Sequence, residues 1–95
     1  MLIYVDIDNT ICETDGTLYA ESKPLFKNIE KINKLYKDNT IVYWTARGSK
    51  TKVDWLELTE FQLNAWGCKY DDIIVGTKPP YDLLICDKTK RIEEI

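Results

Sequence analysis

Two aspartates one residue apart follow a short apolar run at the start of the chain, and this pair constrains the fold most. Leu2 to Val5 consists of Leu, Ile, Tyr and Val, which predicts a buried β-strand. Asp6 and Asp8 come next, and in an extended chain this spacing places both side chains on one face. Because neighbouring carboxylates repel each other, a divalent cation with oxygen ligands is their natural compensator. The alternative is that the pair caps a helix or stabilises a turn.

Between residues 24 and 44 the pattern predicts a helix followed by a second strand. Apolar side chains recur at steps of three and four residues from Pro24 to Lys37, which is the spacing of one helix face. The run from Thr40 to Trp44 is β-branched and aromatic and predicts a strand. Residues 11–24 contain the turn signal Asp15-Gly16, so we expect a small hairpin or flap there.

The second half of the chain repeats the order of helix and then strand. Val53 to Trp66 predicts a helix that stops at Gly67. Its buried stripe is expected to contain Leu56, Leu63 and Trp66. Two short apolar runs, at residues 73–75 and 81–86, predict two further strands.

This alternation of strands and helices predicts an α/β fold with a mainly parallel sheet. We expect residues 1–95 to form a single domain, a compact Rossmann-like three-layer sandwich, because this length supports one core. One junction resists the pattern, since about six residues between Gly76 and Leu83 are fewer than a usual parallel crossover needs. The strand near residue 74 is therefore open to an irregular or antiparallel pairing.

Composition argues against several classes of function. The net charge is −3 with acids and bases interspersed, so we expect no basic nucleic-acid patch. No apolar run approaches membrane-spanning length and no signal-peptide pattern is present, which predicts a cytoplasmic protein without a membrane partner. The three cysteines are widely spaced and are interpreted as reduced thiols. The absence of histidine excludes Ser-His-Asp triads and histidine-ligated zinc, which leaves acid–base chemistry to other side chains.

Polar residues also follow the later strands, at what should be the same edge of the sheet. Thr45 comes directly after the second strand, Lys78 follows the third, and Asp87 follows the fourth. Open α/β sheets bind ligands outside the carboxyl ends of their strands, so these residues are expected to share a site with Asp6. Individually they fit an ordinary turn or a solvated surface; together and in this order they favour phosphoryl transfer.

The same residues resemble the motifs of the haloacid dehalogenase (HAD) superfamily. Asp6-x-Asp8-x-Thr10 is similar to its first motif, and Thr45, Lys78 and Asp87 are similar to its later motifs. The resemblance covers nearly the whole chain and is strongest to a small cap-less group often described as capsule or polysaccharide biosynthesis phosphatases. The blocks that carry it are Trp44–Gly48, Asp54-Trp55, Thr59 with Gln62-Leu63, Trp66-Gly67, Gly76–Pro79 and Asp82–Asp87. It implies a minimal HAD core without a cap domain.

The resemblance further implies a Mg²⁺-dependent phosphomonoester hydrolase. Asp6 would be the nucleophile that forms an aspartyl-phosphate. Asp8 would protonate the leaving oxygen and then activate water. Mg²⁺ would be held by Asp6, by the main-chain carbonyl of Asp8 and by Asp87.

Phosphate binding would fall to residues after the second and third strands. The resemblance implies that Thr45 and Ala46 bind phosphate oxygens and that Lys78 offsets the charge of phosphate and carboxylates together. With no cap domain, only residues 12–23 could shield the site. An open site suits a small phosphosugar or nucleotide-like substrate, or the phosphorylated end of a larger molecule.

Departures from the family pattern leave a second interpretation open. Cys86 stands where the group usually has an acid, so Asp87 must coordinate the metal alone or with water. Thr77 also interrupts the usual Gly-Lys-Pro sequence. The alternative is a degenerate HAD domain that binds a phosphorylated ligand or partner without turnover. A response-regulator-like receiver domain fits less well, because receivers have adjacent acids and a phosphoacceptor on a later strand.

Overall fold

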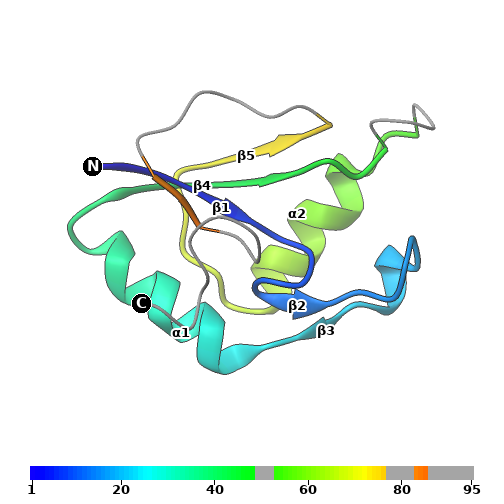
Figure 1. Cartoon of the computed structure of the whole chain (residues 1–95), viewed down its shortest axis with the longest axis horizontal. Helices are drawn as coiled ribbons and strands as arrows, with labels where there is room; N and C mark the ends of the chain where they lie inside the picture. The colour runs from blue at the N-terminus through cyan, green and yellow to red at the C-terminus, as the bar shows by residue number, and fades with distance from the viewer. Residues whose placement is uncertain (49–52, 77–82, 86–95) are drawn as a thin grey trace.

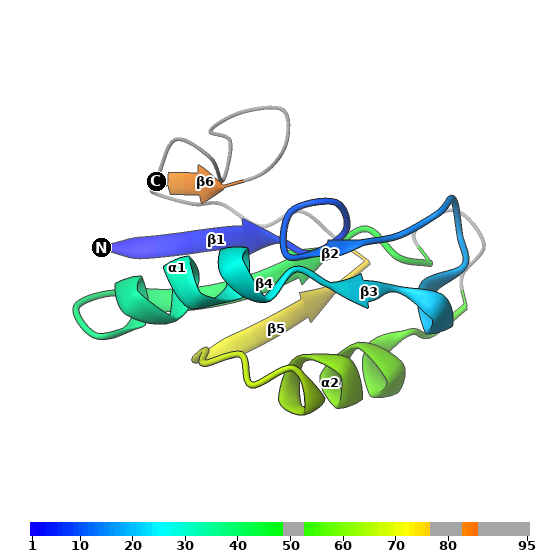
Figure 2. The same ribbon diagram turned by 90° about the horizontal axis from the view of Figure 1, so that it is seen from below.

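Four parallel strands form the central sheet of the protein, as the computed structural model shows (Figure 1). The structure describes residues 1–48, 53–76 and 83–85, the last three by their backbone. The strands are β1 (Leu2–Asp6), β4 (Thr40–Thr45), β5 (Asp72–Val75) and β6 (Leu83–Ile85), in the order β5-β4-β1-β6. All pairings within this sheet are parallel, and the strands point the same way in Figure 2. The predicted α/β fold with a mainly parallel sheet is therefore confirmed.

The strand β5 resolves the junction that the sequence left open. It pairs in parallel with β4, with Tyr43 opposite Ile73 and Thr45 opposite Val75. The antiparallel alternative is therefore wrong. The next strand in the chain, β6, lies at the other edge of the sheet, where it pairs with β1. Consecutive strands thus occupy opposite edges.

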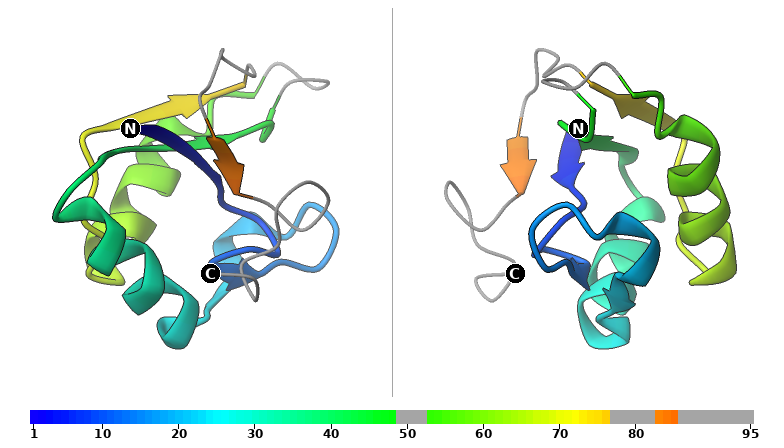
Figure 3. Two further views of the ribbon diagram at one scale, coloured as in Figure 1. Left: turned by 60° about the vertical axis from the view of Figure 1, so that its left-hand side comes forward. Right: turned by 90° about the vertical axis from the view of Figure 1, so that its right-hand side faces the viewer.

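Both described helices, α1 (Phe26–Tyr36) and α2 (Leu56–Ala65), cover the same face of the sheet (Figure 3). The connections β1–α1–β4 and β4–α2–β5 step in the same direction across the sheet. Because such connections are right-handed, successive steps in one direction place their helices on one side. Within the described residues the fold therefore has two layers, the sheet and one layer of helices. The third layer of the predicted sandwich is not found in these residues.

These helices are short. They contain 11 and 10 residues, whereas a membrane-spanning helix needs about 20 apolar residues. No helix in the described part of the chain meets the length and apolarity needed to cross a bilayer.

The main core lies between the helices and one face of the sheet. Side chains alternate along the strands, so every second residue faces the helices. Buried residues on this side are Ile3 and Val5 of β1, Ile41 and Tyr43 of β4, Ile29 and Ile32 of α1, and Leu63 of α2. The opposite face carries a second cluster of Tyr4 and Val42, with Leu2, Trp44 and Ile74 packed against it. By this alternation Asp6 belongs to the face of Tyr4, and Thr45 to the face of Tyr43.

A hairpin flap separates β1 from α1, as predicted for residues 11–24. Strands β2 (Cys12–Glu13) and β3 (Lys23–Pro24) pair antiparallel, and the 3₁₀-helix η1 (Tyr19–Glu21) lies between them. Pro24 is thus in an edge strand, a position that proline tolerates, and the helix begins two residues later than its expected start. The main-chain N–H of Leu25 donates to the carbonyl of Ile11 at 2.8 Å, and this hydrogen bond holds the two ends of the flap together.

The ends of α2 are set by local hydrogen bonds. The Asp54 carboxylate accepts from the N–H of Leu56 at 2.9 Å, and the helix begins there rather than at Val53. At the other end Gly67 has a φ of 75°, and the N–H of Cys68 donates to the carbonyl of Leu63 at 3.0 Å. This is a Schellman motif, so the predicted stop at Gly67 is confirmed.

The buried face of α2 differs from the predicted stripe. Leu63 is fully buried as expected, but Leu56 is 42% exposed, and the polar residues Thr59 and Gln62 are buried beside Leu63. The helix is rotated about its axis so that it presents polar side chains toward the end of β4. The reason is a buried arginine, which is described below.

Leu63 is the residue through which α2 packs into the core. We expect Leu63→Ala to lower the free energy of unfolding by about 2–5 kcal/mol, because it removes buried apolar atoms and leaves a cavity. Phe61 of the same helix is 69% exposed, so Phe61→Ala should change stability by no more than about 0.5 kcal/mol. Urea unfolding of the two variants measures the difference; equal effects would contradict this packing.

Candidate active site

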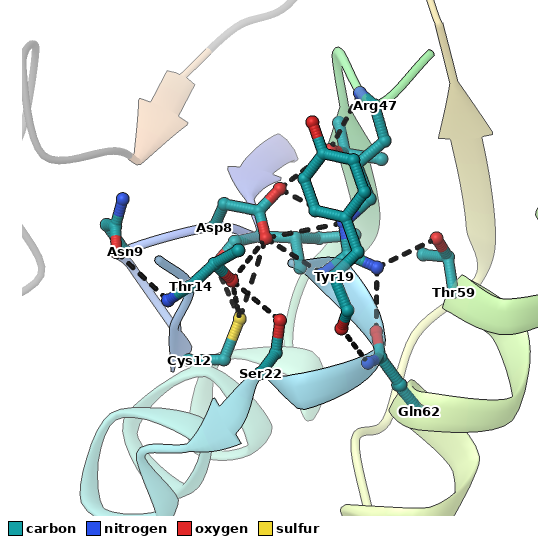
Figure 4. A network of polar contacts seen from close by, with 11 residues as sticks. Asp8, Asn9, Cys12, Thr14, Tyr19, Ser22, Arg47, Thr59 and Gln62 are labelled. Carbon is teal, nitrogen blue, oxygen red and sulfur yellow. Dashed lines mark hydrogen bonds and ion pairs between the residues drawn. The ribbon is translucent and has the colours of Figure 1, made fainter. Parts of the chain in front are cut away.

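The carboxylate of Asp8 is the centre of a polar network at the carboxyl end of the sheet (Figure 4). Its Oδ1 accepts hydrogen bonds from Thr14 Oγ1 at 2.7 Å and from Arg47 Nη2 at 2.8 Å. Its Oδ2 accepts from Arg47 Nε at 3.1 Å and from Thr45 Oγ1 at 3.2 Å. Arg47 thus binds both carboxylate oxygens, the bidentate geometry for which a guanidinium is suited.

A tight turn after β1 places Asp8 in this position. Asn9 has a φ of 63°, in the left-handed region that asparagine tolerates better than most residues. The N–H groups of Thr10 and Ile11 both donate to the carbonyl of Ile7 and close the turn. The side chain of Asn9 accepts from the N–H of Thr14 at 3.2 Å, which ties the turn to the flap.

Arg47 is buried, with 1% of its surface exposed. In addition to Asp8, its guanidinium donates through Nη1 to Thr59 Oγ1 at 3.1 Å and to Gln62 Oε1 at 2.7 Å. A buried charge is costly unless it is paired and hydrogen-bonded, and all three nitrogens of this side chain have partners. The need for these partners explains why α2 buries Thr59 and Gln62.

The flap closes over this arginine. The ring centroid of Tyr19 lies 4.8 Å from the guanidinium carbon of Arg47, a cation–π contact. Gln62 Nε2 donates to the main-chain carbonyl of Tyr19 at 2.6 Å. Trp55 meets the Tyr19 ring edge to face, with centroids 5.0 Å apart. Trp55 is half-buried, so it lies at the rim of the site and not in the core.

The network also determines the charge of Asp8. Burial raises the pKa of this carboxyl group, but hydrogen bonds from Arg47, Thr14 and Thr45, together with the charge of Arg47, outweigh burial and lower the pKa below its usual value. Asp8 is therefore ionised at neutral pH in the free protein.

The topology places this network where α/β sheets bind ligands. From β1 the chain proceeds through β4 to β5 on one side, whereas β6 lies on the other side of β1. The strand order therefore changes direction next to β1, and ligands bind at the carboxyl ends of strands at such a switch point. The flap lies at this end of the sheet in Figure 2.

The predicted site residues are found partly together. Asp8 and Thr45 are in direct contact. Asp6 is half-buried at the end of β1, opposite Trp44 of β4, and Ala46 is exposed directly after β4. Lys78 and Asp87 lie outside the described residues, as does Cys86.

Sequence reasoning gave no role to four residues of the network, namely Thr14, Arg47, Thr59 and Gln62. Two signals in the sequence pointed to three of them, and none pointed to Thr14. Arg47 follows the predicted phosphate-binding pair within two residues, and Thr59 and Gln62 are three positions apart on the second predicted helix. A polar pair at this spacing in a helix that must cover a sheet indicates a buried polar partner.

The described residues contain no group of three or more His, Cys, Asp or Glu side chains that could hold a metal ion. The Asp8 carboxylate is occupied by Arg47, Thr14 and Thr45, which leaves its main-chain carbonyl as its available contribution to a metal site. The carboxylate of Asp6 and this carbonyl are both oxygen donors, which suits Mg²⁺. Two of the three predicted ligands therefore fit this ion, and the third is Asp87.

Comparison with known proteins adds support for the fold. No family model matches the sequence, and no curated protein matches it. Among solved structures, the chain is similar to the crystal structure of a target protein from Vibrio cholerae. The TM-score is 0.72 at 24% identity, over 82% of this chain and 71% of that one. The likeness shows a shared fold.

Removal of the buried guanidinium of Arg47 should lower the stability of the protein. We expect Arg47→Met to lower the free energy of unfolding by about 3–5 kcal/mol, because it leaves the Asp8 carboxylate without its paired charge. The control is Lys34→Met, which removes an exposed pair with Glu30 at 3.7 Å and should change stability by about 0–1 kcal/mol. Chemical unfolding at neutral pH measures both, and comparable losses would contradict a buried pair.

Acid should weaken the same interaction. The pKa of Asp8 is lower in the folded state, so its stabilisation is present above the unfolded value of about 3.9 and is lost as pH falls through the folded value. Asp8→Asn should therefore be less stable than wild type at neutral pH. The difference should shrink as pH decreases below about 4. Urea unfolding in EDTA at several pH values tests this. A difference in unfolding free energy between wild type and Asp8→Asn that does not depend on pH would refute it.

Proposed function

We propose that this protein is a Mg²⁺-dependent phosphomonoester hydrolase of the HAD type, with a Rossmann-like core and no cap domain. The observation that carries the proposal is the meeting of Asp8 and Thr45. They come from the ends of two adjacent parallel strands, join through a 3.2 Å hydrogen bond and lie beside the switch point at β1. The resemblance of the motifs to HAD phosphatases predicts the same juxtaposition.

In the proposed reaction, a carboxylate oxygen of Asp6 attacks phosphorus and the bond to the leaving oxygen breaks. Asp8 gives its proton to that oxygen, and the phosphoryl group remains on Asp6. Water then attacks phosphorus, Asp8 accepts the proton of the water, and the carboxylate of Asp6 is released with inorganic phosphate. The proton that Asp8 takes from water in the second half balances the one that it gave to the leaving oxygen in the first.

The remaining residues bind and neutralise charge. Thr45 and Ala46 bind phosphate oxygens, and Lys78 is proposed to offset the negative charge that gathers during transfer. Mg²⁺ would be held by Asp6, the main-chain carbonyl of Asp8 and Asp87, and would supply charge stabilisation at the phosphoryl oxygens. Because the proposed core has no cap domain to enclose a substrate, the proposed substrate is a small phosphosugar or nucleotide-like ester, or the phosphorylated end of a larger molecule.

Arg47 has a different part in this proposal. Its side chain is buried and all three nitrogens have protein partners, so it is not available to bind the phosphate of a substrate. It holds the carboxylate of Asp8 in one orientation at the end of β1. Rigid placement of reacting groups within hydrogen-bond reach is itself a large contribution to catalysis.

A second candidate is favoured by one observation. Leaving-group protonation requires the acid form of Asp8, whereas the network of the free protein holds Asp8 ionised. A degenerate HAD domain that binds a phosphorylated ligand or partner without turnover is consistent with that charge state. Cys86 in place of an acid points the same way.

Hydrolysis of an aryl phosphate separates the two candidates. We expect turnover that requires Mg²⁺ and is lost in Asp6→Asn, which keeps the shape of the side chain but removes its nucleophilic charge. Asp15→Asn is the control, because it makes the same chemical change at an exposed residue of the flap to which the proposal gives no role. Comparable turnover in wild type and Asp6→Asn would refute covalent catalysis. Phosphate binding without turnover in wild type would support the second candidate.

A further inference from the structure

The hairpin register brings two hydroxyl side chains together beside Asp8. In the flap, Cys12 pairs with Pro24 and Glu13 pairs with Lys23. The next pair in this register is Thr14 and Ser22, and their hydroxyl oxygens are 2.7 Å apart. Side chains directly opposite on antiparallel strands lie close enough to interact. The contact is therefore a consequence of the hairpin.

The direction of the hydrogen bonds follows from the number of protons. A threonine hydroxyl has one proton to donate, and Thr14 Oγ1 donates it to Asp8 Oδ1 at 2.7 Å. Ser22 must then be the donor in its contact with Thr14. The two hydroxyls form a chain that points from the half-buried Ser22 toward the carboxylate of Asp8 (Figure 4).

The two oxygens of Asp8 consequently have different surroundings. Oδ1 accepts its two shortest bonds, from Thr14 at 2.7 Å and Arg47 Nη2 at 2.8 Å. Oδ2 accepts longer bonds from Arg47 Nε at 3.1 Å and Thr45 at 3.2 Å. The oxygen on the flap side is held firmly, and the oxygen beside the proposed phosphate-binding threonine is held less firmly.

We propose that Thr14 is a positioning residue for the proposed phosphatase reaction: with Ser22 behind it, it fixes Oδ1 of Asp8, so that Oδ2 is the oxygen that exchanges one of its longer hydrogen bonds for the leaving oxygen and then the attacking water. This inference rests on the proposed function and adds a role for the flap. Thr14 is 9% exposed, so its hydroxyl does not reach the substrate and acts through Asp8. The hairpin register, set by β2 and β3, thereby determines the orientation of a reacting group.

The first experiment compares kcat and KM for an aryl phosphate in four variants. Thr14→Val removes the donor at nearly constant volume and should lower kcat about 10- to 100-fold with KM little changed, the loss expected for a hydrogen bond to a charged group. Thr14→Ser restores the hydroxyl and should recover kcat to within a few-fold of wild type. Ser22→Ala should have a smaller effect in the same direction. Thr17→Val is the control, because Thr17 is exposed in the same flap.

Two kinetic results would overturn the proposal. One is a kcat for Thr14→Val within about twofold of wild type. The other is a fall in kcat for Thr14→Ser as large as that for Thr14→Val, together with equal losses of thermal stability, which would indicate a structural role alone.

A second measurement does not depend on turnover. The ¹³C resonance of the Asp8 carboxyl carbon, assigned by its absence in Asp8→Asn, should shift in Thr14→Val at neutral pH and remain near its wild-type position in Thr14→Ser. An unchanged resonance in Thr14→Val would overturn the contact, whatever the activity. A shifted resonance in a protein with no phosphatase activity would leave the placement of Asp8 by Thr14 supported and refute the proposed function instead.

Discussion

The buried ion pair between Asp8 and Arg47 is the interaction on which the rest of the site depends. A guanidinium that is 1% exposed must have a complete set of partners, because an uncompensated buried charge costs several kcal/mol. The turn after β1 supplies the carboxylate, α2 supplies Thr59 and Gln62, and the flap supplies the ring of Tyr19. One side chain therefore links the strand β4 that precedes it to three other parts of the fold.

The flap is bound to this pair from two sides. Through Thr14 it reaches the carboxylate directly, and through the carbonyl of Tyr19 it binds Gln62 of α2. A two-stranded hairpin has little stability alone, so these contacts are what order it over the end of the sheet. In the folded chain the side chain of Asp8 is 21% exposed, and the flap contributes to this burial through Thr14. The proposed chemistry benefits from this, because electrostatic interactions strengthen as water is excluded.

Much of the fold could be predicted from local patterns. Apolar periodicity identified the strands and helices, and the glycine after Trp66 identified the end of α2. Boundaries shifted where a tertiary contact competed with local preference: Pro24 joined the flap as an edge strand and did not open α1. The parallel pairing of β5 was not predictable, because the short segment before β6 suggested a local connection, whereas β6 pairs with β1 across the sheet.

The sequence by itself determined where the candidate chemistry is expected, since Asp6 and Thr45 end the apolar strands β1 and β4, Asp8 lies in the turn after β1, and the carboxyl ends of parallel strands meet at one edge. Only the tertiary structure decided how Asp8 is held. Its partner Arg47 is 39 residues away in the chain, and the partners of Arg47 depend on the rotation of α2 about its axis. Periodicity defines an apolar stripe but does not reveal a buried charge, whose requirement for hydrogen bonds turned polar residues of α2 inward. The polar pair Thr59 and Gln62 indicates from sequence that α2 has a buried polar partner, but only three-dimensional packing decides that this partner is Arg47.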